Sequence, residues 1–200
     1  MPDVPSDAEV LGEMIQWKFS NPAKPTVLLP KPVFAGPADR NYNLKNGKVR
    51  KFLQHEEQSV GINLGWTEDA EPETGKKVAR WFFARKSGGD KPLRYGETVA
   101  LGNGMKPSFI RYKERPVGIN LDWSDGPVYE WRLAGGELGQ PADPSKYLAI
   151  YNEKAGEFFI YFDRTAGGDI GWPSSKTWGG QLSDALLEQA KKKAYDLLLT

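Results

Sequence analysis

The chain has 200 residues, a formal net charge of +1, and 39% hydrophobic and 12% aromatic residues. This composition is typical of a globular protein that can bury a substantial core, and it excludes an intrinsically disordered chain. The small net charge provides no global field toward nucleic acid, and the absence of cysteine excludes disulfides, thiol nucleophiles and thiolate metal sites.

The N-terminal segment is expected to form an amphipathic helix over residues 6–19. Ser6 and Glu9 have the spacing of a capping box, apolar residues recur at helical spacing as far as Phe19, and Asn21-Pro22 ends the pattern. The acidic N-terminus lacks the apolar stretch of a signal peptide, and no apolar run reaches the roughly 20 residues that span a bilayer. We therefore expect a protein that is cytoplasmic or released without a signal peptide.

A proline-rich segment follows the predicted helix. Residues 22–39 contain five prolines, which indicates a linker or an extended arm, with one strand-like piece at 26–29. The length of the chain suits one domain with attachments. The predicted organisation is an N-terminal helix and arm over 1–39, a repeat domain over 40–179 and a C-terminal helix over 180–200.

A heptapeptide recurs within the repeat domain. Residues 60–66 read VGINLGW, and residues 117–123 read VGINLDW, which is one change at a distance of 57 residues. A worn third copy, GGDIGW at residues 167–172, ends 49 residues after the second. Periods of this size indicate one supersecondary unit that is used several times.

Each repeat is expected to contain four short strands bounded by Gly, Pro, Asn or Asp. The first strand ends at an asparagine, the second carries paired apolar residues, the third is the heptapeptide and the fourth lies near another tryptophan. Asn46-Gly47 and Asn103-Gly104 predict type I′ turns, which need positive φ at both central residues. The fourth strands are expected over 78–84, 128–133 and 176–178, with Trp81, Trp131 and Trp178 as their matched tryptophans.

Residues 183–199 are expected to form a second helix. Ser183 is a suitable N-cap, and Glu188 and Lys192 have the spacing of a helical ion pair. Its apolar stripe should pack on the N-terminal helix, which would bring the two ends of the chain together outside the repeat domain.

Three repeats of four short strands resemble a β-trefoil, in which three such units close a six-stranded barrel capped by three hairpins. The resemblance covers roughly residues 40–179 and rests on the number of repeats and on matched Trp, Asn and Phe positions. The expected fold class is therefore all-β, a β-trefoil of three four-stranded repeats flanked by short N- and C-terminal α-helices, with a threefold prism or a sandwich as alternatives. The Gln-x-Trp signature of trefoil lectins is not matched, so the sugar-binding residues of that subgroup are not carried over.

No complete catalytic site is found in the sequence. His55 is the one histidine, and the repeat offsets align it with Tyr112 and Tyr161, so it is interpreted as part of an aromatic column. We therefore expect no enzyme, no metal site and no cofactor.

The repeated third strand supplies the candidate ligand-binding residues. Its tryptophans are either core residues or platforms for sugar stacking, and its polar residues either satisfy turn backbone or bind hydroxyl groups. The second copy is the best preserved and adds a carboxylate two residues after its asparagine, so it should be the strongest of three unequal sites. The candidates are Asn120, Asp122, Trp123, Asn63, Trp66, Asp169 and Trp172.

These residues lead to three hypotheses for function. The first is a carbohydrate-binding, lectin-like module whose partner is a glycan or glycoconjugate, with part of its basis in the resemblance. The second is a cell-targeting toxin or defence protein, and the third is a protein-interaction scaffold. No nucleic acid partner is expected, whereas membrane contact and oligomers formed through the terminal helices stay open.

Overall fold

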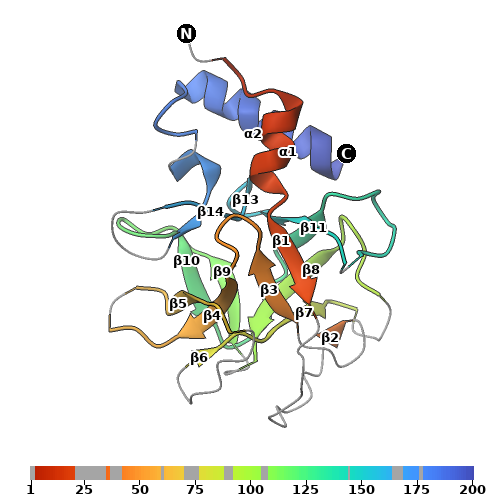
Figure 1. Cartoon of the computed structure of the whole chain (residues 1–200), viewed down its shortest axis with the longest axis vertical. Helices are drawn as coiled ribbons and strands as arrows, with labels where there is room; N and C mark the ends of the chain where they lie inside the picture. Colours follow the sequence, from red (N-terminus) through yellow and green to blue (C-terminus); the bar gives the residue numbers. More distant parts are fainter. Residues whose placement is uncertain are drawn as a thin grey trace.

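The computed structural model describes residues 3–20, 35–36, 42–59, 61–69, 77–87, 92–104, 108–143, 145–163, 169–175 and 178–200. The chain is mostly β-structure in antiparallel sheets, and two helices lie together at one end of it (Figure 1). Both termini are found at the helical end (Figure 1). The strand-like piece expected at 26–29 lies outside the described residues.

The elements follow the chain in the order helix, strands, short 3-10 helix and helix. The helices are α1 (Asp7–Met14), η1 (Pro173–Ser175) and α2 (Asp184–Leu199). The strands of the described residues are β1 (Trp17–Ser20), β2 (Ala35–Gly36), β3 (Asn43–Asn46), β4 (Phe52–Glu56), β5 (Leu64–Thr67), β6 (Lys77–Val78), β7 (Trp81–Arg85), β8 (Thr98–Asn103), β9 (Ser108–Tyr112), β10 (Leu121–Ser124), β11 (Trp131–Ala134), β12 (Ala149–Asn152), β13 (Glu157–Phe158), β14 (Ile160–Tyr161) and β15 (Ile170–Gly171).

The N-terminal helix is shorter than the sequence predicted. Its capping box is present, because Ser6 N donates to Glu9 Oε2 at 2.7 Å and Glu9 N donates to Ser6 Oγ at 3.3 Å. The helix ends at Met14, however, and the prediction of helix as far as Phe19 is wrong, since β1 begins at Trp17. Trp17 and Phe19 alternate with polar neighbours, and both are buried in the main core, which favours a strand.

The strand pairings follow one another around a ring of six strands. β1 pairs with β3, β7 with β8, β8 with β11 and β11 with β12. Two isolated bridges complete the circuit: Tyr42 with Trp81 links β3 to β7, and Trp17 with Leu148 links β1 to the residue before β12. The segment expected to lie outside the repeat domain therefore supplies one strand of this ring.

A buried tryptophan begins three strands of the ring, β1, β7 and β11. In each case it lies opposite the asparagine that ends the neighbouring strand. The pairs are Trp17 with Asn46, Trp81 with Asn103 and Trp131 with Asn152.

The same three indoles tie the ring to the hairpins. Their N–H groups donate to backbone carbonyl oxygens over 2.6, 2.7 and 2.8 Å, in Phe159, Leu53 and Ile110 respectively. These acceptors are separated by the repeat offsets, so one arrangement occurs three times. Satisfying a buried indole N–H avoids the cost of an unpaired donor in the core.

The third tryptophan of this set was assigned to Trp178, and that assignment is wrong. Trp17 occupies the position, although it precedes the first repeat in sequence by many residues. Trp178 instead packs in a second cluster with residues of both helices. The other two residues of the expected strand at 176–178 lie outside the described residues.

In the part of the chain that the structure describes, three hairpins join the ring: β4 with β5, β9 with β10 and β14 with β15. The second strand of each hairpin comes from a copy of the heptapeptide, as expected. The expected strand at 78–84 is divided between β6 and β7, because β6 pairs with β4 whereas β7 pairs with β8.

The turn after β3 differs from the type I′ turn that Asn46-Gly47 predicts. Positive φ falls on Arg50, at 60°, rather than on Gly47. The Asn46 side chain organises the turn instead, since its Oδ1 accepts from Lys48 N at 3.0 Å. Asn152 Oδ1 does the same with Lys154 N at 2.9 Å. The asparagines therefore act through their side chains, as in Asx turns.

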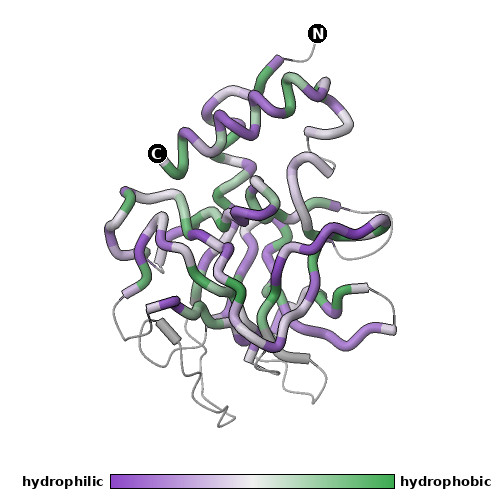
Figure 2. The backbone as a smooth tube through the Cα atoms, turned by 180° about the vertical axis from the view of Figure 1, so that it is seen from behind, coloured by the Kyte–Doolittle hydropathy of each residue, from purple (hydrophilic) through white to green (hydrophobic). Residues whose placement is uncertain are grey.

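The C-terminal helix matches its prediction, with Ser183 as N-cap. It packs on α1. Val10 and Met14 of α1 and Ala190 and Ala194 of α2 belong to a second buried cluster. Figure 2 shows hydrophobic and hydrophilic residues alternating along both helices. Each helix is therefore amphipathic and can bury one apolar face. The predicted pair of Glu188 with Lys192 is replaced by pairs of Glu188 with Lys191 and of Lys192 with Asp196.

Candidate functional site

The two heptapeptide asparagines close the hairpin loops. Asn63 Oδ1 accepts from Gln58 N at 3.0 Å, and Asn120 Oδ1 accepts from Arg115 N at 3.0 Å. Asn63 also has a left-handed backbone, with φ of 57°. The amide oxygens of both residues are thus engaged in loop structure.

The candidate tryptophans stack on the tryptophans of the ring. Ring centroids lie 6.1 Å apart for Trp17 and Trp66, 6.2 Å for Trp81 and Trp123, and 6.3 Å for Trp131 and Trp172. Trp66 and Trp123 are partly buried, whereas Trp172 is buried. One face of each indole is therefore committed to the core, and only the first two retain surface for a ligand.

Trp123 also links two hairpins. Its indole N–H donates to Ile62 O at 2.7 Å, in the loop that precedes β5. The His55 ring meets it edge-on at 5.2 Å, and His55 is itself buried. The aromatic position that the sequence assigned to His55 is thus a packing position beside Trp123.

Asp122 lies at the centre of a cationic cluster that was not predicted. Its carboxylate oxygens lie 2.8 Å from Arg115 Nη2, 3.0 Å from Lys113 Nζ and 3.3 Å from Arg111 Nη2. Only 21% of the Asp122 side chain is exposed, whereas the three cations are 36–54% exposed. We call Arg111, Lys113, Arg115 and Asp122 the β9–β10 cluster.

The β9–β10 cluster has a net charge of +2, because three cations surround one carboxylate. Burial opposes ionisation of Asp122, but hydrogen bonds from Lys113 and Arg111 outweigh it and hold the pKa of the carboxyl below its usual range. The carboxylate therefore stays charged at neutral pH. The Nε atoms of Arg111 and Arg115 are buried without a hydrogen-bond partner, so the guanidinium groups are held in place but incompletely satisfied.

An exposed apolar residue stands at the tip of the same hairpin. Val117, two residues after Arg115, is 85% exposed. The hairpin therefore presents a cationic face, a partly buried indole and an apolar tip within one short segment.

The first repeat has the same hairpin with different chemistry. At the offset of 57, the four cluster residues correspond to Gln54, Glu56, Gln58 and Gly65. A side chain at Gly65 would collide with Glu56 Oε2, which fills the space beside the glycine. Gln54 Nε2 donates to that carboxylate at 2.9 Å. An acid and amides thus replace the cations of the second repeat.

The third repeat places acids near its hairpin. Tyr161 donates its phenol to Asp163 Oδ1 at 2.7 Å, and that hydrogen bond, with burial and the charges of Asp163 and Asp169, raises the pKa of Tyr161 to about 12. Asp169 is partly buried beside β15. The structure therefore does not bring the candidates of the three copies together, since each repeat carries its own set.

Polar residues that precede the ring tryptophans have a structural role. Gln16 Oε1 accepts from Asn46 Nδ2 at 2.9 Å and from Tyr161 N at 2.8 Å. Glu130 Oε1 accepts from Asn152 Nδ2 at 3.1 Å and also from the backbone N–H of Tyr112. These buried groups connect neighbouring repeats.

Within the described residues, no group of three or more His, Cys, Asp or Glu side chains could hold a metal ion. None of the helices in that part of the chain is long and apolar enough to cross a membrane.

The basic residues of the β9–β10 cluster were missed by sequence reasoning, although a signal was present. Arg111, Lys113 and Arg115 occupy alternate positions, which places their side chains on one side of an extended segment. The position of Asp122 opposite Arg111 in the register of β10 and β9 brings the carboxylate to them.

Neither a protein-family model, nor a curated protein, nor a solved structure matches this chain.

Proposed function

We propose that the protein is a carbohydrate-binding, lectin-like module on a β-trefoil, and that the β9–β10 cluster binds the acidic group of a glycan. In the proposed trefoil, β1 acts as the fourth strand of the third repeat. The recurrent Trp–Asn pairs, the indole hydrogen bonds and the ring of six strands support that description.

The charge difference between equivalent hairpins carries the proposal. Hairpin β4–β5 forms with amides, one acid and a glycine at the positions that hold Arg111, Lys113, Arg115 and Asp122 in hairpin β9–β10. The fold therefore does not need those cations. Clustering three cations also has an electrostatic cost, which a function in binding would explain.

The geometry favours an acidic sugar over a neutral one. Guanidinium groups bind carboxylate and sulfate through paired N–H donors, and Asp122 holds the two arginines in fixed positions before a ligand arrives. Val117 provides exposed apolar surface at the tip of the same hairpin, which suits the C–H face of a sugar ring. Asp122 then acts as a positioning residue, and its competition with an anionic ligand is offset by the net charge of +2.

The test is a glycan array that contains matched neutral, carboxylated and sulfated oligosaccharides. We expect the wild-type protein to bind acidic members, and the double variant Arg111→Gln/Arg115→Gln to lose about tenfold or more in affinity, as the loss of charged hydrogen bonds predicts. The matched control is Lys146→Gln/Lys192→Gln, which removes two cations whose side chains are 75% exposed and lie outside the cluster.

Binding of neutral and acidic glycans to the same extent would retain a lectin but remove the role of the cluster. Absence of binding to every glycan would remove the proposed function. Binding of anionic vesicles or nucleic acid in place of glycans would keep the cationic site and assign it to phosphate.

A further inference from the structure

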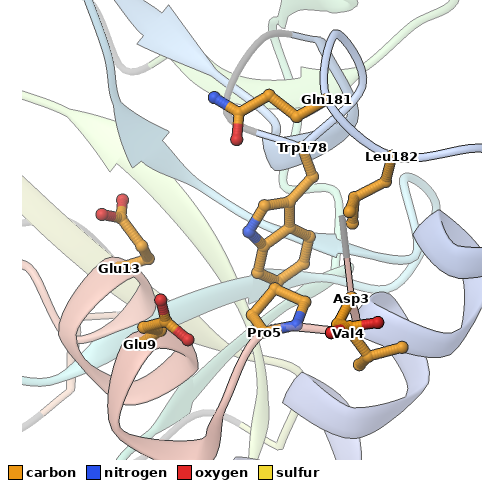
Figure 3. Close-up of a pocket in the computed structure, with 8 residues that line it drawn as sticks. All are labelled: Asp3, Val4, Pro5, Glu9, Glu13, Trp178, Gln181 and Leu182. Atoms are coloured by element: carbon orange, nitrogen blue, oxygen red, sulfur yellow. The ribbon is translucent and has the colours of Figure 1, made fainter. Parts of the chain in front are cut away.

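A cavity of about 440 Å³ lies between the N-terminal end of the chain and the turn before α2. Val4, Pro5 and the α1 residues Glu9 and Glu13 form one side, and Trp178, Gln181 and Leu182 form the other (Figure 3). Its volume lies within the range of about 300–1,000 Å³ that is usual for small-molecule sites. The cavity shares no residue with the β9–β10 cluster, so it is an independent site.

Trp178 lines this cavity and is not one of the tryptophans that pack inside the ring of six strands. Trp17 takes the core position that the repeat pattern gave to Trp178. Trp178 packs instead among the helices and is 5% exposed, and Val4 and Leu182 pack against the same cluster. The indole stands between α1 and the segment that leads to α2 (Figure 3). Trp178, Val4 and Leu182 therefore give the cavity an apolar and aromatic part.

The polar part of the lining is acidic. Asp3, Glu9 and Glu13 line the cavity, and no Lys, Arg or His does so. Glu9 accepts two hydrogen bonds from Ser6, which lower the pKa of its carboxyl, and Glu13 pairs with Lys48. Within the described residues Asp3 has no hydrogen bond or ion pair.

Asp3, Glu9 and Glu13 do not form a group that could hold a metal ion, and no such group of three or more His, Cys, Asp or Glu occurs among the described residues. A larger cation fits the arrangement better. An aromatic face attracts a cation through its quadrupole, and carboxylates at a distance complement a charge carried on a hydrocarbon stem.

We propose that this cavity binds an organic cation, a guanidinium or ammonium group on a hydrocarbon stem, with the charge toward Asp3 and Glu9 and the stem against Trp178. The cation is either a free small molecule or a basic side chain of another chain. This site is separate from glycan binding and does not depend on it.

The test compares two probes that differ in charge and hardly in shape, N-acetyl-arginine amide and N-acetyl-citrulline amide, by calorimetric titration of the full chain. We expect the arginine probe to bind at least about tenfold more tightly than its neutral counterpart. Butylguanidine forms a second arm, because it carries a single guanidinium charge on a hydrocarbon stem without a peptide backbone. Equal binding of butylguanidine assigns the site to free cations, and tighter binding of the peptide amide assigns it to a basic residue.

The variant for this site is Asp3→Asn/Glu9→Gln. Glutamine at position 9 can still complete the capping box, so α1 should persist, as circular dichroism would verify. The matched control, Asp196→Asn, removes an acid of α2 that pairs with Lys192 and does not line the cavity. We expect the double variant to lose about tenfold in affinity for the arginine probe and the control to keep it.

Equal binding of the arginine and citrulline probes, or no binding of either to the wild-type chain, would overturn the proposal without reference to any variant. An equal loss in the Asp196→Asn control would also overturn it, because the effect would then come from general charge. None of these results bears on glycan binding at the β9–β10 cluster.

Discussion

Hairpins β4–β5 and β9–β10 share the register of their strand pairing and differ in the side chains that they present. In both, an asparagine side chain closes the loop, by accepting from Gln58 N or Arg115 N at 3.0 Å. The first presents amides and one acid, whereas the second presents three cations around Asp122. The comparison separates the residues that build the hairpin from those that are free to acquire a function.

The largest expected effect concerns the shared part of the two hairpins. Trp81 supports β4 through Leu53 O, and Trp131 supports β9 through Ile110 O. Replacing either buried indole with alanine should lower the free energy of unfolding by about 3–5 kcal/mol, because a large cavity is created. Denaturant unfolding of Trp81→Ala and Trp131→Ala should give similar losses. A loss confined to one of them would break the equivalence of the hairpins.

A transfer of chemistry should come next in size. The quadruple variant Gln54→Arg/Glu56→Lys/Gln58→Arg/Gly65→Asp gives the first hairpin the residues of the second. In the wild type the Glu56 carboxylate fills the space beside Gly65, so replacing Glu56 makes room for the new aspartate. We expect a second acidic-glycan site, worth about 1.5–3 kcal/mol of added binding relative to the unmodified hairpin. Calorimetry in an Arg111→Gln/Arg115→Gln background measures it alone. Failure of a folded variant to bind would show that the four side chains are insufficient.

The two loop asparagines should differ by a smaller amount. Asn120→Ala loses one hydrogen bond and should cost about 1 kcal/mol. Asn63→Ala loses the equivalent bond and also places alanine at a φ of 57°, so its cost should be about 2 kcal/mol. Asn63→Gly should be more stable than Asn63→Ala by about half of the difference between the two alanine variants, since glycine adopts positive φ without a Cβ penalty. Thermal melts of the three variants measure the order, and equal losses for Asn63→Ala and Asn120→Ala would contradict it.

The smallest effect is the contribution of Asp122 to stability. Its pKa is lowered in the folded state, so its contribution is present above the unfolded pKa of about 4 and is lost as pH falls through the folded pKa. Because the partners are partly exposed, Asp122→Asn should cost no more than about 1 kcal/mol at pH 7. Melting temperatures of wild type and variant should converge on acidification from pH 5 to pH 2. A difference that persists unchanged at pH 2 would assign the effect to packing.

The periodic residues made much of this architecture predictable. The heptapeptide located the second strand of each hairpin, and Ser6, Glu9 and Ser183 marked the helix starts. The role of Trp17 was not predictable from the repeat, because it lies outside the period and next to a helical pattern. Its burial depends on pairing with Asn46 and Leu148, which are distant in sequence.

The candidate sites show the same limit. Asp122 was proposed from its place in the repeat, whereas its three cationic partners are revealed only by the pairing of β9 with β10, which brings the carboxylate to them. The cavity beside Trp178 joins the two ends of the chain, which no local pattern could reveal. Strand alternation predicts which face of the sheet a side chain lies on. The residues that it contacts on that face depend on the packing of segments that are distant in sequence.

The stoichiometry of acidic-glycan binding tests the central claim most directly. Three equivalent repeats would offer three sites, whereas the charges on the described hairpins favour one, at β9–β10. Isothermal titration with a single acidic oligosaccharide should give one site per chain, and Arg115→Gln should weaken it by about tenfold. Three sites of similar affinity, or one site that Arg115→Gln leaves unchanged, would contradict the assignment.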